Sequence, residues 1–212
     1  SMPEMPSLLH LIARMRYRGI SSLTASLRAR LHPIQASIAP LVATATKDKI
    51  GLEIGGPSRM FRKKNILPVY PEAKRIDNVN FANATTWESG LLEGGDFPFA
   101  PVKPPGRQFL REATRLDGIP DASYDFVLSS HCLEHVANPL AALREWGRVT
   151  RDGGYLLLIL PDPQGTFDHR RPITTIEHLR QDFALNSGED DLTHLPEIVD
   201  LHDLALDRHA GS

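Results

Sequence analysis

The spacing of apolar and polar residues divides the chain into three zones. In residues 7–45, apolar positions recur at helical spacing with arginines between them, which predicts short helices. In the middle zone, short apolar runs alternate with helical or loop segments. Strands that alternate with helices in this way predict a parallel sheet covered on both faces. From Asp162 onward we expect a helix over 174–183, an acidic stretch and no strand.

The middle zone contains five candidate strands and one clear helix. The helix begins near Pro139, presents Leu140, Leu143 and Trp146 on its apolar face, and ends near Val149. A stretch rich in glycine and proline over 83–107 interrupts the alternation and is expected to be a long loop. The candidate strands are 50–55, 74–79, 108–114, 124–130 and 154–161.

Composition and charge narrow the class of protein. With 212 residues, 41% hydrophobic and 24% charged, the chain has ordinary globular composition, and we find no apolar run long enough for a membrane span. The single cysteine, Cys132, excludes an internal disulfide framework and favours a cytoplasmic protein. We expect three parts: a helical extension over 1–47, a central domain over 48–181 and an acidic segment over 182–212.

The basic residues of the extension raise the question of partners. The chain lacks the stripes of Lys and Arg with interleaved aromatic residues that single-strand binders use, so we expect no nucleic-acid partner. The amphipathic stretch 7–18 is expected to pack against the following domain. Peripheral contact with an anionic membrane through 7–18 is the alternative.

Polar residues and glycines follow the first three candidate strands. Gly55 and Gly56 end the first, Asp77 lies 22 positions after Gly55 in the second, and Glu112 lies near the end of the third. A glycine turn lets a ligand approach the backbone, and an acid about twenty residues later can accept hydrogen bonds from ribose hydroxyls. A second acid can accept a hydrogen bond from an exocyclic amine. The pattern predicts a site for an adenosine-containing cofactor, although a tight turn alone would also explain the two glycines.

The chain from Leu52 to Pro161 resembles the class I S-adenosylmethionine-dependent methyltransferases. The residues that carry the resemblance are Leu52-Glu53-Ile54-Gly55-Gly56, Glu112-Ala113-Thr114-Arg115-Leu116, the run from Tyr124 to Val136, and then Glu145, Arg148-Val149, Gly153-Gly154 and Leu160-Pro161-Asp162. The resemblance implies a Rossmann-like α/β fold, a mostly parallel sheet with helices on both faces. We expect this chain to lack the last two strands of the family fold.

The resemblance also implies the cofactor, S-adenosylmethionine, and the residues that bind it. Gly55 and Gly56 would border its methionine part, with Glu53 beside them. Asp77 would bind the ribose hydroxyls. The remaining cofactor-binding candidates are Glu112 with Ala113 at the adenine, and Ser129 with His131 along the floor of the pocket.

A catalytic base is needed only when the methyl acceptor must lose a proton. The candidates are His131, His135, Asp168 and His169, each of which has a structural hydrogen-bonding role as its alternative. His194, His202 and His209 match no tight zinc spacing, so we expect no metal. A Cys132–His131 nucleophile is not expected, since neighbouring residues usually point apart.

The prediction is therefore a methyltransferase acting on a small molecule or glycan. The segment His169-Arg170-Arg171-Pro172 resembles those of proteins of bacterial cell-surface glycan synthesis, which makes a sugar hydroxyl the first acceptor hypothesis. The alternatives are a non-catalytic methyltransferase-like binding module and a nicotinamide-dependent nucleotide-sugar enzyme. The dinucleotide pattern G-x-G-x-x-G is missing after Gly55, which argues against the latter. A homo-oligomer is a further hypothesis.

Overall fold

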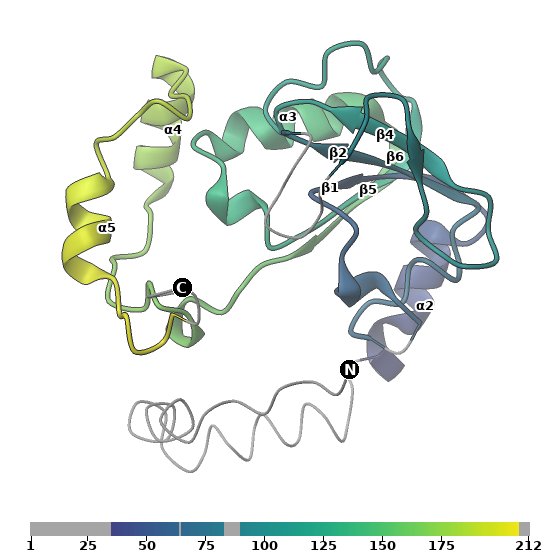
Figure 1. The fold of residues 1–212 in the computed structure, drawn as a ribbon, viewed down its shortest axis with the longest axis horizontal. Helices are drawn as coiled ribbons and strands as arrows, with labels where there is room; N and C mark the ends of the chain where they lie inside the picture. The colour runs from purple at the N-terminus through teal and green to yellow at the C-terminus, as the bar shows by residue number, and fades with distance from the viewer. Residues whose placement is uncertain (1–34, 64, 83–89, 208–212) are drawn as a thin grey trace. The chain divides into compact units, whose positions relative to one another are not determined.

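Five parallel strands and one short antiparallel strand form the sheet of the protein (Figure 1). The computed structural model describes residues 35–63, 65–82 and 90–207, so the stretch 7–18 lies outside the described residues. The sheet runs in the order β3-β4-β2-β1-β5-β6, and β3 is antiparallel to β4. The strands are β1 (Ile50–Ile54), β2 (Arg75–Asn80), β3 (Asp96–Phe97), β4 (Gly106–Leu110), β5 (Tyr124–Ser130) and β6 (Thr150–Ile159).

The described chain forms two units, which we treat separately. The sheet unit comprises Gln35–Leu160 and Thr174–Asp191, and the C-terminal unit comprises the described residues 161–173 and 192–207. The helices of the sheet unit are α2 (Gln35–Thr46), α3 (Pro139–Val149) and α4 (Ile176–Leu185), with short 3-10 helices at Arg59–Phe61 and Leu133–His135. The C-terminal unit contains α5 (Leu195–Leu201) and a 3-10 helix at Pro163–Gly165.

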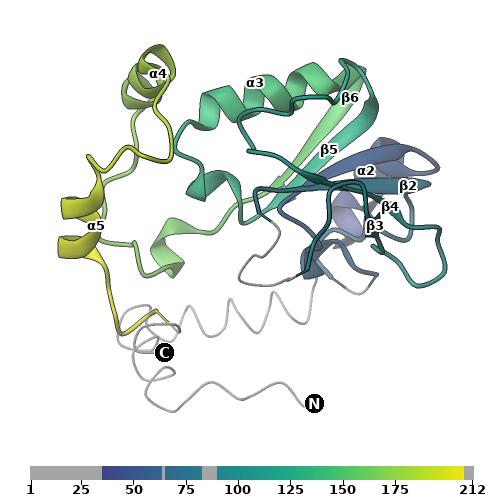
Figure 2. The same ribbon diagram turned by 45° about the horizontal axis from the view of Figure 1, so that its top comes forward.

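Helices α3 and α2 cover opposite faces of the sheet (Figure 2). Asn138 begins α3 by accepting a hydrogen bond from the Ala141 N–H, and Pro139 suits the first turn because it lacks an N–H. Trp146 is fully buried against Leu52 and Val127, and its Nε1 donates to the Ala113 carbonyl at 2.9 Å. These contacts fix the segment after β4 against α3.

The structure confirms most of the predicted elements and corrects some bounds. The helix over 139–149 and the strand over 124–130 have the expected bounds. The third strand ends at Leu110 rather than at residue 114, because the chain turns there and the Arg115 N–H bonds the Glu112 carbonyl. The fifth begins at Thr150 rather than at residue 154. The expected loop 83–107 contains β3, which extends the sheet beyond β4.

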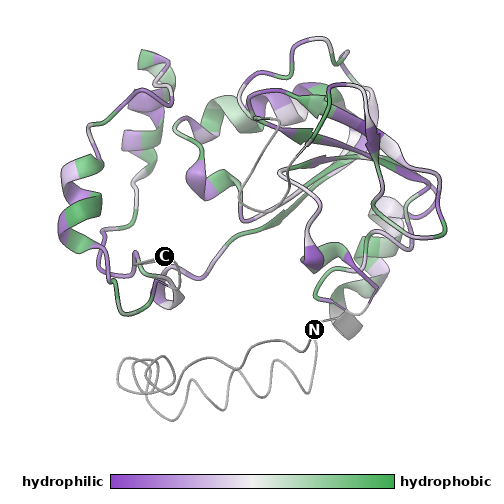
Figure 3. Ribbon diagram, viewed as in Figure 1, coloured by the Kyte–Doolittle hydropathy of each residue, from purple (hydrophilic) through white to green (hydrophobic). Residues whose placement is uncertain are grey.

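Strand β6 forms one edge of the described sheet. Its second half is apolar, as Figure 3 shows, yet Tyr155 and Leu156 are 40% and 39% exposed. The described residues 161–207 contain no strand, as expected from the sequence. None of the described helices is both long and apolar enough to cross a membrane.

Candidate functional site

The parallel strands place the predicted site residues at one edge of the sheet. Ile54 at the end of β1 pairs with Val79 of β2 and with Ser129 of β5, and Asn80 pairs with Leu110 of β4. The carboxyl ends of these four neighbouring strands therefore lie side by side. In open parallel sheets, ligands bind outside this edge.

Gly55 makes the turn that follows β1. Its φ of +80° lies in the left-handed region that side chains disfavour, and its N–H donates to the Val79 carbonyl at 2.8 Å. A Cβ built on Gly55 would lie 3.3 Å from the Cβ of Cys132. The glycine turn and the segment after β5 are therefore in contact, and Gly55 exposes its backbone between them.

Glu53 is completely buried beneath the segment Gly55–Ser58. Its carboxyl group accepts hydrogen bonds from the Tyr70 hydroxyl at 2.8 Å and from the Ser58 N–H at 2.9 Å. Burial raises the pKa of Glu53 to about 8, and burial together with Glu53 raises the pKa of Tyr70. Glu53 is therefore mostly neutral at pH 7. In this geometry it shapes the turn rather than presenting a carboxylate to solvent.

Gly56 is held by asparagines from β2. The Gly56 N–H donates to Asn78 Oδ1 at 3.0 Å, and its carbonyl accepts from Asn80 Nδ2 at 3.1 Å. A Cβ on Gly56 would lie 2.3 Å from Glu53 Cδ and 2.7 Å from Asn78 Oδ1. Glycine is needed at position 56 because the buried polar groups fill the space that a side chain would take. The requirement therefore comes from packing inside the protein and not from a ligand.

Sequence reasoning missed Tyr70, Asn78 and Gln108 as members of this buried network. Asn78 Nδ2 donates to Gln108 Oε1 at 2.9 Å, which links β2 to β4. Asn78 and Gln108 could have been noticed in the sequence, because each is a polar amide in a predicted strand. Strands of a parallel sheet that is covered on both faces usually carry apolar residues at such positions.

Asp77 lies away from the strand ends. It is three residues before the end of β2, and its carboxylate is engaged within the protein. It forms an ion pair with Arg75 at 3.1 Å and accepts from the Arg107 N–H at 2.9 Å and the Tyr124 hydroxyl at 3.0 Å. The side chain at the end of β2 is instead Asn80, beside the glycine turn.

Glu112 and Ala113 follow β4 at the same edge. Glu112 is exposed, so its carboxylate is open to a ligand. Ala113 is half-buried and is fixed through its carbonyl by Trp146. Both residues therefore follow β4 at the carboxyl edge of the sheet, and their contact with an adenine stays a prediction.

The end of β5 supplies two serines and a histidine. Ser129 is buried and its hydroxyl donates to the Ile54 carbonyl at 3.2 Å. The Ser130 hydroxyl is buried and has no hydrogen-bond partner among the described residues. His131 follows with φ +53°, a sparsely populated conformation that clusters at functional sites, and its ring is 45% exposed, 3.5 Å from Glu134. His135 is exposed in the next 3-10 helix.

Cys132 does not have the character of a nucleophile. Burial is the largest influence on its thiol and raises the pKa, so the sulfur is protonated at neutral pH. This agrees with the expectation that His131 and Cys132 do not form a nucleophilic pair.

Asp168 and His169 belong to the C-terminal unit, so the structure does not join them to the strand-end residues. His169 is almost fully buried, and its Nε2 lies 2.9 Å from Asp203, which also pairs with Arg170. The hydrogen bond from His169 is the largest influence on Asp203 and lowers the pKa of that carboxyl group. Within its own unit, His169 has a clear structural role.

Comparisons with known proteins point to one family. Residues 102–158, from before β4 into β6, match the family described as Methyltransferase domain. This match covers about a quarter of the chain and confirms the resemblance to methyltransferases. No curated protein matches the chain.

Solved structures show partial likeness to the chain. YcgJ protein from Bacillus subtilis is 21% identical, with 58% of this chain and 50% of that chain covered and a TM-score of 0.42. A putative methyltransferase from Bacillus halodurans is 16% identical, with 58% and 44% covered and a TM-score of 0.35. The arsenic(III) S-adenosylmethionine methyltransferase of Chlamydomonas reinhardtii is 17% identical, with 66% and 50% covered and a TM-score of 0.41. The chain spans about half the length of these structures.

Proposed function

We propose that this chain is an S-adenosylmethionine-dependent methyltransferase that binds the cofactor at the carboxyl ends of β1, β2, β4 and β5. The observation that carries the proposal is the exposed backbone of Gly55 at the same edge as the buried Ser130 hydroxyl, which has no hydrogen-bond partner in the described part of the chain. A buried hydroxyl without a partner costs about 1–3 kcal/mol, which a ligand hydrogen bond would recover. The match of 102–158 to a methyltransferase family supports the same site.

The residues at this edge fit a cofactor without phosphates. The turn after β1 leads into a 3-10 helix of three residues, Arg59–Phe61. A dinucleotide needs the N-terminus of a longer helix for its pyrophosphate. S-adenosylmethionine supplies an already activated methyl group on a sulfonium and places no such demand on the protein. The fit therefore favours this cofactor over a nicotinamide dinucleotide.

Each strand end would then have a distinct role. Glu112 would accept a hydrogen bond from the adenine amine of the cofactor, and Ala113 would border the adenine ring. Gly55 would line the methionine part of the cofactor. Asn80 takes over the ribose position in this proposal, because Asp77 is occupied by Arg75, Arg107 and Tyr124. The Ser129 hydroxyl is engaged by the Ile54 carbonyl. The remaining polar candidates are Ser130, whose buried hydroxyl has no partner among the described residues, and the exposed His131 that follows β5.

We infer a hydroxyl acceptor, with a sugar as the first candidate and His131 as the base. The His131 ring is half exposed at the strand ends, and Glu134 lies within 3.5 Å of its Nδ1. A carboxylate in that position can orient the imidazole ring. His135 is the second candidate base. As the base, His131 predicts that His131→Gln loses methyl transfer to a monosaccharide acceptor by a larger factor than it loses affinity for the cofactor.

Calorimetric titration with S-adenosylhomocysteine tests the cofactor site. We expect the wild type to bind, and Glu112→Ala to weaken binding by roughly 1–3 kcal/mol through loss of the adenine contact. Asp117→Asn is the matched control, since Asp117 is an exposed acid in the same segment that pairs only with the exposed Arg115. A folded wild type without detectable binding would refute the proposal, and binding of NAD instead would favour the nicotinamide alternative. Binding without methyl transfer would favour the non-catalytic module.

A further inference from the structure

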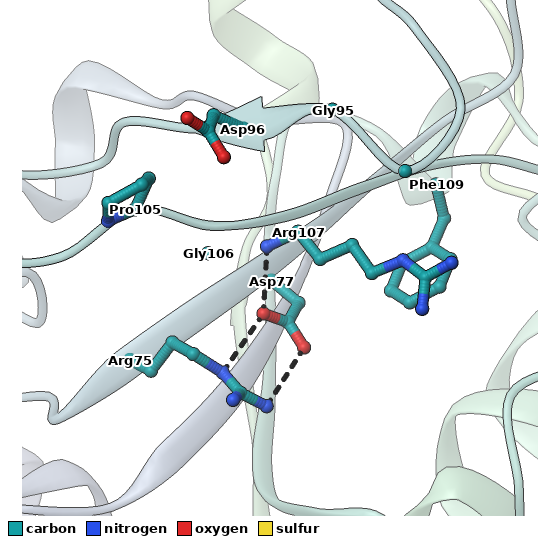
Figure 4. A pocket seen from close by; sticks show the side chains of 9 residues that line it. Arg75, Asp77, Gly95, Asp96, Pro105, Gly106, Arg107 and Phe109 are labelled. Atoms are coloured by element: carbon teal, nitrogen blue, oxygen red, sulfur yellow. Dashed lines mark hydrogen bonds and ion pairs between the residues drawn. The ribbon is translucent and has the colours of Figure 1, made fainter.

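A cavity lies beside β2, β3 and β4, and it is lined by Asp77 but by none of the residues that the proposed cofactor site uses (Figure 4). Its volume is about 450 Å³, within the usual range of small-molecule sites. Glycines form much of its wall, and Gly106 has no room for a side chain because a Cβ would collide with the Ile76 carbonyl. Backbone therefore forms one wall of an open cavity that charged side chains border.

The pair formed by Arg75 and Asp77 is a fixed, neutral part of this cavity. Asp77 binds Arg75 through both carboxylate oxygens, at 3.1 and 3.3 Å, and also accepts from the Arg107 N–H and the Tyr124 hydroxyl. With four donors on one buried carboxylate, Asp77 has no free capacity for a ligand. Its role is to hold the backbone of Arg107 in place.

Arg107 brings an exposed positive charge to the cavity. Its guanidinium lies over the Phe109 ring at 5.0 Å, as Figure 4 shows, and Gly94 leaves room beside it. No carboxylate in the described part of the chain forms an ion pair with it. Glu93, which also feels its charge, is bound to Arg111 at 2.9 Å. A guanidinium oriented by a ring, with its N–H groups free, is suited to a carboxylate or phosphate group.

Asp96 is the second unengaged charge at the same cavity. It lies opposite Arg107 in the pairing of β3 with β4, and no ion pair joins these two described residues. A bare anion would gain from Arg107 and be repelled by Asp96. A ligand that also carries hydroxyl groups can satisfy both, since a carboxylate accepts hydrogen bonds from hydroxyls.

We propose that this cavity binds a small hydroxylated anion, a sugar phosphate or a sugar acid, with Arg107 on the anionic group and Asp96 on the hydroxyls. The volume exceeds what a phosphate ion alone would fill and suits a monosaccharide. The cavity and the strand-end site share no proposed ligand-binding residue, so each can be tested without the other.

Titration of the full chain with four probes tests this proposal. Glucose 6-phosphate and glucuronate are the two candidate hydroxylated anions. Inorganic phosphate, which lacks the sugar hydroxyls, and glucose, which lacks the charge, are the controls. We expect at least one of the two hydroxylated anions to bind at least tenfold more tightly than either control. The hydroxylated anion that binds more tightly shows whether the cavity prefers a sugar phosphate or a sugar acid.

Variants assign the two recognition roles. Arg107→Gln keeps the backbone N–H that binds Asp77, so the fold should persist, and we expect at least tenfold weaker binding. Arg180→Gln on the exposed surface of α4 makes the same charge change and should leave binding unaltered. Asp96→Asn should also weaken binding, because the carboxylate accepts hydroxyls better than an amide.

Three results would overturn the proposal. They are absence of binding of both hydroxylated anions to the folded wild type at millimolar concentration, unchanged affinity in Arg107→Gln, and tighter binding in Asp96→Asn. Thermal unfolding of each variant confirms that the fold is retained.

Discussion

Buried polar residues give this protein its most specific features at the scale of single residues. Glu53 is neutral at pH 7 because it is fully buried, and Tyr70 and Ser58 satisfy its carboxyl group. The predicted acid in the glycine motif is thus present, but in this structure it faces inward. Any contact between Glu53 and the cofactor remains a prediction.

The raised pKa of Glu53 makes stability depend on pH. In the unfolded chain its pKa is near 4.5, and in the folded protein it is about 8. Between these values the folded protein keeps a proton that the unfolded chain releases, so the free energy of unfolding falls as pH rises. The total fall is on the order of 4 kcal/mol. Urea unfolding from pH 4.5 to 8 measures it.

Glu53→Gln is the matched test of that assignment. Glutamine has nearly the same shape as the neutral carboxyl group and cannot ionise. We expect the variant to lose this part of the pH dependence and to be at least as stable as the wild type at pH 8. An unchanged slope in the variant would show that other groups cause the dependence.

Removal of the Tyr70 hydroxyl should destabilise the fold. In Tyr70→Phe the buried Glu53 loses one of its two donors, which we expect to cost about 1–3 kcal/mol of the free energy of unfolding. Tyr155→Phe is the control, because Tyr155 is 40% exposed and its hydroxyl can bond to water. Equal effects of the two substitutions in urea unfolding would argue against the network.

The turn after β1 is the element on which the proposed site depends. Its conformation comes from three neighbours in the fold: β2 through Asn78 and Asn80, the segment after β5 through Cys132, and Tyr70. The protein's own contacts therefore hold the turn against the ends of the neighbouring strands.

Gly56→Ala should disrupt this turn. The new methyl group would stand 2.3 Å from Glu53 Cδ, so either the turn or the network must move, and we expect a loss of more than about 2 kcal/mol in stability. Gly147→Ala in α3 is the opposite case. Nothing lies within 4 Å of its Cβ position, and alanine favours a helix by about 0.5–1 kcal/mol. Thermal unfolding compares the two, and a neutral Gly56→Ala would contradict the described packing.

At the scale of the whole molecule, β6 is an edge strand of the described sheet without the usual protection against pairing. Residues 155–159 carry no charge and no proline, the devices that usually protect edges. Residues on both faces of β6 pack partly against the core, which is typical of a strand inside a parallel sheet. Such an edge favours pairing with another strand.

We expect this edge to cause concentration-dependent association. Leu156→Lys should reduce it, because a charge on an edge strand opposes pairing. Leu41→Lys on α2 is the control, since Leu41 is 68% exposed and lies outside the sheet. Sedimentation velocity measures both variants. A wild type that stays monomeric at every concentration would contradict the expectation.

Local pattern predicted most of the elements but missed β3. Helical period and Pro139 placed α3, and strand-like runs predicted β1, β2 and β5, because these signals depend on neighbours in the chain. The glycines after β1 and Glu112 after β4 lie at a common edge, since parallel strands end together, whereas Asp77 lies inside β2. That a ligand binds at this edge stays a prediction.

Tertiary structure alone decided how individual polar side chains are used. Asp77 and Asn80 differ by three positions, yet the buried Asp77 carboxylate is engaged by the half-exposed Arg75, and Asn80 lies at the edge. The Glu53 side chain points into the protein because the Tyr70 hydroxyl and the Ser58 N–H bind its carboxyl group. Whether a polar group meets a ligand or the protein depends on contacts between residues far apart in sequence, and no local pattern encodes those contacts.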